Sequence, residues 1–160
     1  MVVLGRDERK ALALVVVVYG VSFAAGVLRG AGLPAPSQPV PVALQPTALW
    51  VHNMITLAPL WAGVFSFGAL TLMWLLLQGW AHGLLLGASG QPIAAVLGRI
   101  WPHSLFELAA MWIAATVGLV PGVALFWRNR VELAWRTWPA WAIVWAGLLA
   151  VAAWLEGGGR

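Results

Sequence analysis

The chain has 160 residues, of which 62% are hydrophobic and only 9% are charged, and its formal net charge is +4. A water-soluble domain needs about a quarter of its residues charged to cover its surface, so a soluble globular protein is excluded. A mean hydropathy of +0.88 instead indicates a membrane domain whose outer surface faces lipid. The basic residues form short separate groups rather than one continuous face, which excludes a nucleic-acid-binding protein.

The chain contains no cysteine. Disulfides, thiolate catalysis and cysteine-based metal sites are therefore excluded. The first apolar stretch follows Arg9 and Lys10, as the apolar part of a signal peptide would. It is long for such a segment, and Leu28-Arg29-Gly30 is a poor cleavage site, so we interpret this stretch as a retained membrane anchor.

The apolar stretches have the length of membrane spans. A helix needs about 20 apolar residues to cross a hydrocarbon core of about 30 Å. The predicted spans are residues 11–28, 47–64, 67–87, 101–126 and 140–155. The sequence therefore predicts an all-α fold, a polytopic transmembrane helix bundle of about five spans, in a single membrane domain of residues 1–160.

The segments between the spans carry loop and interface signals. Residues 30–46 contain five prolines and no charge, which predicts an extended loop outside the bilayer because proline lacks an N–H and fixes φ. Gly63, Ser66 and Gly68 predict a tight turn between the second and third spans. Residues 127–139 mix arginines with tryptophans, as an interfacial amphipathic helix does.

Three smaller features refine this topology. Residues 93–98 form a short apolar stretch that we expect as a half-turn at the interface. Pro121 is expected to kink or end the fourth span. The 12 tryptophans, many of them near predicted span ends, are expected to anchor the helices at the headgroup level and to add packing bulk.

The distribution of basic residues predicts the orientation. Six of the nine lysines and arginines precede the first span or lie between the fourth and fifth. Because cytoplasmic loops carry the excess of positive charge, the N-terminus is expected in the cytoplasm. The proline-rich loop and the C-terminus are then extracytoplasmic, in a bacterial or archaeal plasma membrane.

Six polar side chains lie inside the predicted spans. They are His52, Asn53, Gln78, His82, His103 and Glu107. His103 and Glu107 are four residues apart and share a helix face, as do Gln78 and His82. Buried acids in a membrane are costly and are usually paired or turned toward water. The predicted topology places all six toward the outer side, where they are in a position to form one polar cluster.

Small residues accompany these polar groups. Gly118 continues the helix face of His103 and Glu107, and Gly79, Gly83 and Gly87 repeat every four residues in the third span. Small residues at this spacing allow helices to approach closely in a membrane. We therefore expect these glycines at helix-packing contacts, including contacts between copies of the chain.

Three interpretations of the polar cluster stay open. It is a structural hydrogen-bond network with Glu107 paired to His103 or Asn53, an interaction site open to the outer face, or a metal or catalytic site. Three histidines and one glutamate suit a tetrahedral zinc site, with His103 and Glu107 as the candidate ligands. The spacing is not that of a zinc protease, however, and we predict no cofactor.

The segment Trp101-Pro102-His103-Ser104-Leu105-Phe106-Glu107 resembles the Pro-His-Gly-x-x-Glu signature of the stage II sporulation protein M family. Asn53 with the glycines that follow it, and Gln78-Gly79 with Gly83, also resemble segments of that family, over residues 48–122. Ser104 stands where the family pattern has glycine, and Gln78 where it usually has asparagine. The matching motif positions are Asn53, His103 and Glu107.

The resemblance implies a multi-pass membrane protein. Sporulation members of that family scaffold a cell-wall-remodelling machinery, while other relatives occur in organisms that do not sporulate. We expect a non-enzymatic scaffold or assembly factor that lies in the lipid bilayer, self-associates and contacts cell-wall-remodelling membrane proteins. The alternatives are a small transporter or permease-like subunit and a membrane metalloprotein that uses the His and Glu side chains.

Overall fold

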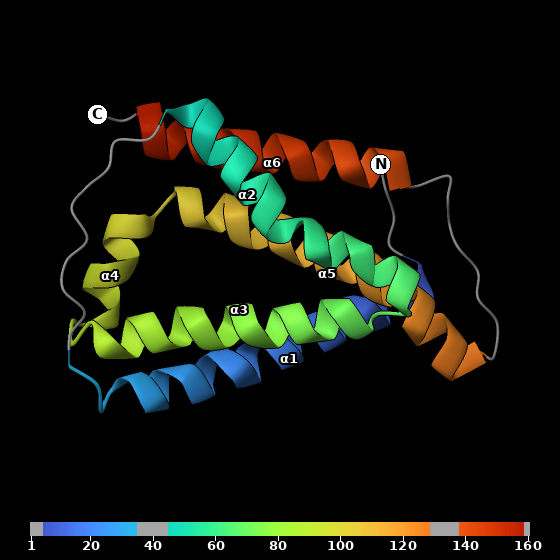
Figure 1. Ribbon diagram of the computed structural model, residues 1–160, viewed down its shortest axis with the longest axis horizontal. Coiled ribbons are helices and arrows are strands. Elements are labelled where there is room, and N and C mark those ends of the chain that lie inside the picture. The colour runs from blue at the N-terminus through green and yellow to red at the C-terminus, as the bar shows by residue number, and fades with distance from the viewer. Residues whose placement is uncertain (1–4, 35–44, 129–137, 159–160) are drawn as a thin grey trace.

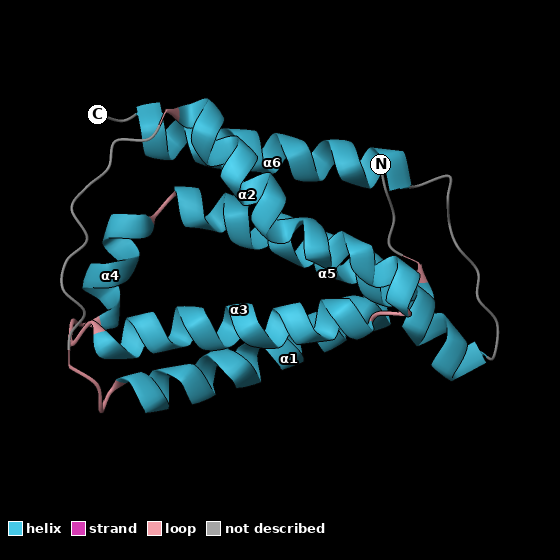
Figure 2. Cartoon of the chain, in the orientation of Figure 1, coloured by secondary structure: helices cyan, strands magenta, loops and turns pink. Residues whose placement is uncertain are grey.

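A computed structural model describes residues 5–34, 45–128 and 138–158 (Figure 1). Within these ranges the chain forms α-helices and one short 3-10 helix, joined by turns (Figure 2). The elements are α1 (Arg6–Gly30), α2 (Pro46–Ala62), η1 (Gly63–Ser66), α3 (Ala69–Ala88), α4 (Ile93–Ile100), α5 (His103–Arg128) and α6 (Trp138–Gly158).

Five of these helices are long and apolar enough to cross a membrane, and α4 is the short exception. This confirms the predicted all-α bundle of about five spans. The long helices run up and down, so that α1, α3 and α6 finish at one end and α2 and α5 begin there (Figure 1). We call the end where α1 begins the N-terminal end of the bundle, and the end where α6 finishes the C-terminal end.

The observed bounds differ from the predicted spans by a few residues. The residues expected as an interfacial half-turn form the two-turn helix α4, which lies between the end of α3 and the start of α5 (Figure 1). Pro121 does not end α5, which continues to Arg128. Most of the proline-rich loop and of the predicted interfacial segment lies outside the described residues, at 35–44 and 129–137.

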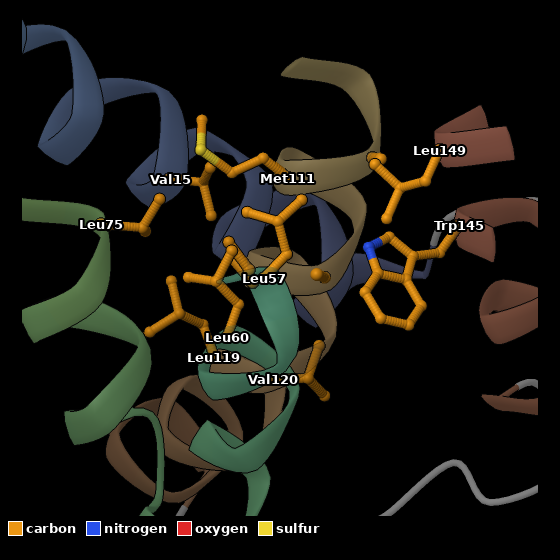
Figure 3. Packing of buried hydrophobic residues seen from close by; sticks show 13 residues of the cluster. Val15, Leu57, Leu60, Leu75, Met111, Leu119, Val120, Trp145 and Leu149 are labelled. Carbon is orange, nitrogen blue, oxygen red and sulfur yellow. The ribbon is translucent and has the colours of Figure 1, made fainter. Parts of the chain in front are cut away.

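Helix α5 is the centre of the bundle. In its most apolar window 61% of the residues are buried, against 22–28% in the other four long helices. Its buried face is rich in small residues, including Ala110, Ala114 and Ala115, all fully buried. Small side chains let neighbouring helices approach from several sides at once. Figure 3 shows the resulting core, where Met111 of α5 lies near Val15 of α1.

Helices α1 and α3 run parallel and touch through glycine. A Cβ at Gly83 of α3 would collide with the Phe23 carbonyl of α1, and a Cβ at Gly26 of α1 would collide with the Trp80 carbonyl of α3. Gly87 lies in the same way against Val27. The two backbones are therefore closer than any side chain at these positions permits, and the predicted glycine ladder packs within one chain.

A tight turn between α2 and α3 packs on α5 at the N-terminal end. Phe67 and Gly68 both have positive φ, at 50° and 87°, and a bulky residue such as Phe67 rarely adopts this conformation. The Phe67 carbonyl lies against Gly122 of α5, where a Cβ would collide with it. The Thr71 hydroxyl donates to the Leu60 carbonyl at 2.8 Å, which ties α3 to the end of α2.

Two tryptophans join helices through hydrogen bonds. The Trp50 indole N–H of α2 donates to the Ala146 carbonyl of α6 at 3.1 Å. The Trp74 indole N–H of α3 donates to the Thr56 carbonyl of α2 at 2.8 Å. Both side chains are half-buried. These tryptophans therefore fix neighbouring helices through hydrogen bonds, a role beyond the anchoring and packing bulk expected from the sequence.

Replacement of Gly83 by alanine tests the close contact of α1 and α3. The added methyl group collides with backbone rather than with a flexible side chain, so the helices must move apart. We expect Gly83→Ala to lower the free energy of unfolding by about 1–3 kcal/mol, measured by reversible unfolding in detergent. Gly20→Ala in α1 is the control, because a Cβ there meets nothing within 4 Å. Equal stability of the two variants would contradict the contact.

Candidate functional site

Asn53 of α2 and Glu107 of α5 form a direct hydrogen bond. The Asn53 side-chain N–H group, at Nδ2, donates to Glu107 Oε1 at 2.6 Å, and both residues are half-buried. The two residues lie 54 positions apart in the chain. A carboxyl group inside a membrane bundle is costly unless it is paired, so this bond both satisfies Glu107 and fixes α2 against α5.

Three other titratable groups lie close enough to act electrostatically on Glu107. His103 comes one turn earlier in α5, His52 is on α2, and Glu156 is near the end of α6. Glu156 carries the same charge as Glu107, whereas a protonated histidine would offset it. The C-terminal end of the bundle thus brings together polar groups from three helices, which we call the Glu107 group: Asn53, Glu107, His52, His103 and Glu156.

His82 is in a different contact. The Tyr19 hydroxyl of α1 and His82 Nδ1 of α3 lie 2.9 Å apart, within hydrogen-bonding distance. The Tyr19 ring also stacks on Phe23, with centroids 6.0 Å apart. This pair joins the same two helices as the glycine contact. Gln78 lies one turn before His82 in α3, is half-buried and makes no hydrogen bond with the described residues.

The structure therefore divides the six predicted polar residues. Four of them belong to the Glu107 group, namely His52, Asn53, His103 and Glu107 itself. Gln78 and His82 lie instead on α3, where His82 contacts Tyr19. A common position along the membrane normal was inferred from sequence, but the sequence does not show which helices are neighbours.

One row of α3 residues explains the separation. This α3 stripe consists of Thr71, Leu75, Gln78, His82 and Leu85. Thr71 and Leu75 are fully buried, whereas Gln78 is half-buried, His82 is exposed and Leu85 is 59% exposed. The residues share one helix face, so the loss of cover on this face means that α3 diverges from α5 toward the C-terminal end, while it stays packed on α1 through Gly83 and Gly87. Figure 1 shows α3 and α5 farther apart there, with α4 between their ends.

Two members of these contacts were absent from the sequence prediction. Tyr19 lies well inside the first span, and as the single tyrosine of the chain it was a visible signal. Glu156 follows the last predicted span, on the same predicted side as Glu107. A phenol group inside a span and an acidic residue next to a span end are the sequence signals for these two residues.

The described residues do not assemble a complete zinc site around the two predicted ligands, His103 and Glu107. Among the described residues no group of three or more His, Asp and Glu side chains is placed to hold a metal ion. His103 and Glu107 lie one turn apart in α5, and the Asn53 side-chain N–H donates to Glu107 Oε1. The arrangement of these side chains is suited to holding helices in register, since each polar contact joins two different helices.

A family model described as Stage II sporulation protein M matches residues 13–158 of the chain. The chain belongs to that family. This confirms the resemblance seen in the Pro-His-x-x-x-Glu segment. Two of the motif positions, Asn53 and Glu107, are the partners of the 2.6 Å hydrogen bond.

The chain is also similar to an uncharacterized protein of Methanocaldococcus jannaschii. The two are 30% identical over 74 residues, which cover 44% of this chain and 42% of the relative. The match thus spans less than half the length of that relative. No solved structure matches the chain.

Removal of the Asn53 amide tests the bond to Glu107. Asn53→Leu leaves the half-buried carboxyl group without its donor, so the free energy of unfolding in detergent should fall by about 1–3 kcal/mol. Glu107→Gln retains an acceptor oxygen and should lose less. The double variant Asn53→Leu, Glu107→Leu should lose less than the sum of the single leucine variants, because both partners are then apolar. Strict additivity would show that the two side chains do not interact.

Proposed function

We propose that this protein is a non-enzymatic membrane scaffold that docks a transmembrane helix of another chain on the uncovered part of α3. The observation that carries the proposal is the α3 stripe. Its first two residues are sealed inside the bundle, and its polar residues Gln78 and His82 are left with little or no cover. Membership of the sporulation protein M family supports a membrane assembly role.

The energetic argument concerns Gln78. It lies at the midpoint of a membrane-crossing helix and makes no hydrogen bond with the described part of the chain. Lipid tails offer no hydrogen-bond partner, and an unsatisfied polar group in hydrocarbon costs several kcal/mol. A glutamine amide in this position is satisfied when a second helix packs against it.

A second copy of the chain is the first candidate for that helix. A primary amide carries both a donor and an acceptor, so Gln78 of one copy is complementary to Gln78 of another. His82 has its Nδ1 at Tyr19, which leaves Nε2 for a second contact. The stripe ends in the exposed Leu85, which adds apolar area beside the polar groups.

The glycine faces are a poorer choice for self-association than the sequence indicated. Gly79, Gly83 and Gly87 face α1 of the same chain, and Gly118 faces the Leu60 carbonyl of α2. The proposed contact between copies therefore moves from the glycine ladder to the α3 stripe, about a third of a turn away around the helix.

We also propose that the N-terminus is cytoplasmic, as the basic residues before α1 suggest. The C-terminal end of the bundle, with the Glu107 group, is then extracytoplasmic. A scaffold in this orientation presents the open part of α3 in the outer half of the membrane. Membrane-anchored cell-wall-remodelling proteins are the partners that the family membership suggests.

Replacement of Gln78 by leucine tests self-association through the α3 stripe. We expect the wild-type protein to have a mass of more than one chain in detergent, measured by light scattering. Gln78→Leu removes the proposed hydrogen bond between copies and breaks no hydrogen bond that the described residues make. The dissociation constant, measured by energy transfer between labelled copies in vesicles, should rise about fivefold, which corresponds to about 1 kcal/mol.

Leu76→Ala is the matched control, because Leu76 is 49% exposed on the other side of α3. It should associate as the wild type does, and both variants should unfold at the wild-type temperature or above. A strictly monomeric wild-type protein, or unchanged association of Gln78→Leu, would contradict the proposed docking surface.

A further inference from the structure

A cavity of about 210 Å³ lies between α1, α5 and α6, away from the polar groups described above. Glu8 and Leu12 line it from α1, and Trp138 and Trp141 from the first turns of α6. The remaining wall is one side of α5, between Ala109 and Val120.

The lining residues of α5 recur every three or four positions, so they form one stripe along the helix. From Ala109 to Val120 this stripe is about 16 Å long, at a rise of about 1.5 Å per residue. Because α5 crosses the membrane, the cavity extends in the direction of the lipid acyl chains. Its lining is almost entirely apolar, including Ile113 and Val117.

Glu8 is the one ionisable residue among the lining residues that the structure describes. It lies in the first turn of α1, where one carboxylate oxygen accepts a hydrogen bond from the Gly5 backbone N–H. Neighbouring Lys10 is held elsewhere, 4.6 Å from the centroid of the Trp127 ring. Glu8 makes no ion pair within the described ranges, so its carboxylate contributes an uncompensated negative charge to the wall of this apolar cavity.

We propose that this cavity is a binding site for one membrane phospholipid with a primary-amine headgroup. One acyl chain lies along the α5 stripe, and the ammonium group lies at the Glu8 carboxylate. A primary ammonium carries N–H donors and a positive charge, both of which a carboxylate accepts. Trp138 and Trp141 flank the cavity with rings suited to the membrane interface.

The site is separate from the α3 stripe, so its occupancy does not depend on self-association. Bound lipid fills the space between α1, α5 and α6 that the described residues leave open. Phospholipid held in this way resists delipidation, whereas lipid at the outer surface of the bundle exchanges freely.

The test is lipid retention after purification from vesicles of equal parts phosphatidylethanolamine and phosphatidylglycerol. Native mass spectrometry counts the lipids held by each chain after detergent exchange. We expect one retained lipid per chain, with phosphatidylethanolamine favoured. Glu8→Gln removes the charge but keeps the hydrogen bond to Gly5, because glutamine also completes this capping arrangement. The preference for the amine headgroup should then fall about fivefold.

Ile113→Trp fills the cavity and should abolish retention of either lipid. Ala109→Leu is a second, smaller filling variant, in case the tryptophan disturbs folding, and unfolding temperatures identify folded samples. Leu76→Ala should retain lipid as the wild type does. Absence of retained lipid in the wild type, equal retention of both headgroups, or retention unchanged by both filling variants would overturn the proposal.

Discussion

The contact of α1 with α3 through glycine determines how the other helices are arranged. Because Gly26, Gly83 and Gly87 lie against backbone, the two helices form a closely packed parallel pair. Parallel neighbours in a membrane require an intervening span in the opposite direction, and α2 provides it. This pair presents Val15 and Leu75 to α5, and the core around α5 is built on that surface.

The same arrangement of helices determines where the close packing of the core ends. Near the N-terminal end, the turn at Phe67 and Gly68 and the contacts of Gly118 and Gly122 hold α2, α3 and α5 together. Toward the C-terminal end α3 leaves α5, and its polar residues lose their cover. The Asn53–Glu107 bond ties α2 to α5 at this end. Polar side chains thus serve two purposes, one inside the chain and one that we assign to a partner.

Much of this fold could be predicted from the sequence. Hydrophobic length alone gave five spans, because a helix must satisfy its own backbone in lipid. The Asn53–Glu107 pairing was one of the open alternatives, supported by the position of both residues near the same side of the membrane. The neighbours of α3 could not be predicted, because a five-span pattern is compatible with several arrangements of helices. The contact of Tyr19 with His82 could not be predicted either, because it requires α1 to lie beside α3.

A cysteine scan along α3 from Leu76 to Leu85 tests most directly whether another copy of the chain covers the α3 stripe. The chain has no cysteine of its own, so each single substitution in native membranes reports one position. We expect cross-links between copies at Gln78, His82 and Leu85, with little at Leu76 and Trp80, which are exposed on the other side of the helix. Cross-linking that peaks at Leu76 and Trp80, or that is absent along the whole helix, would contradict it.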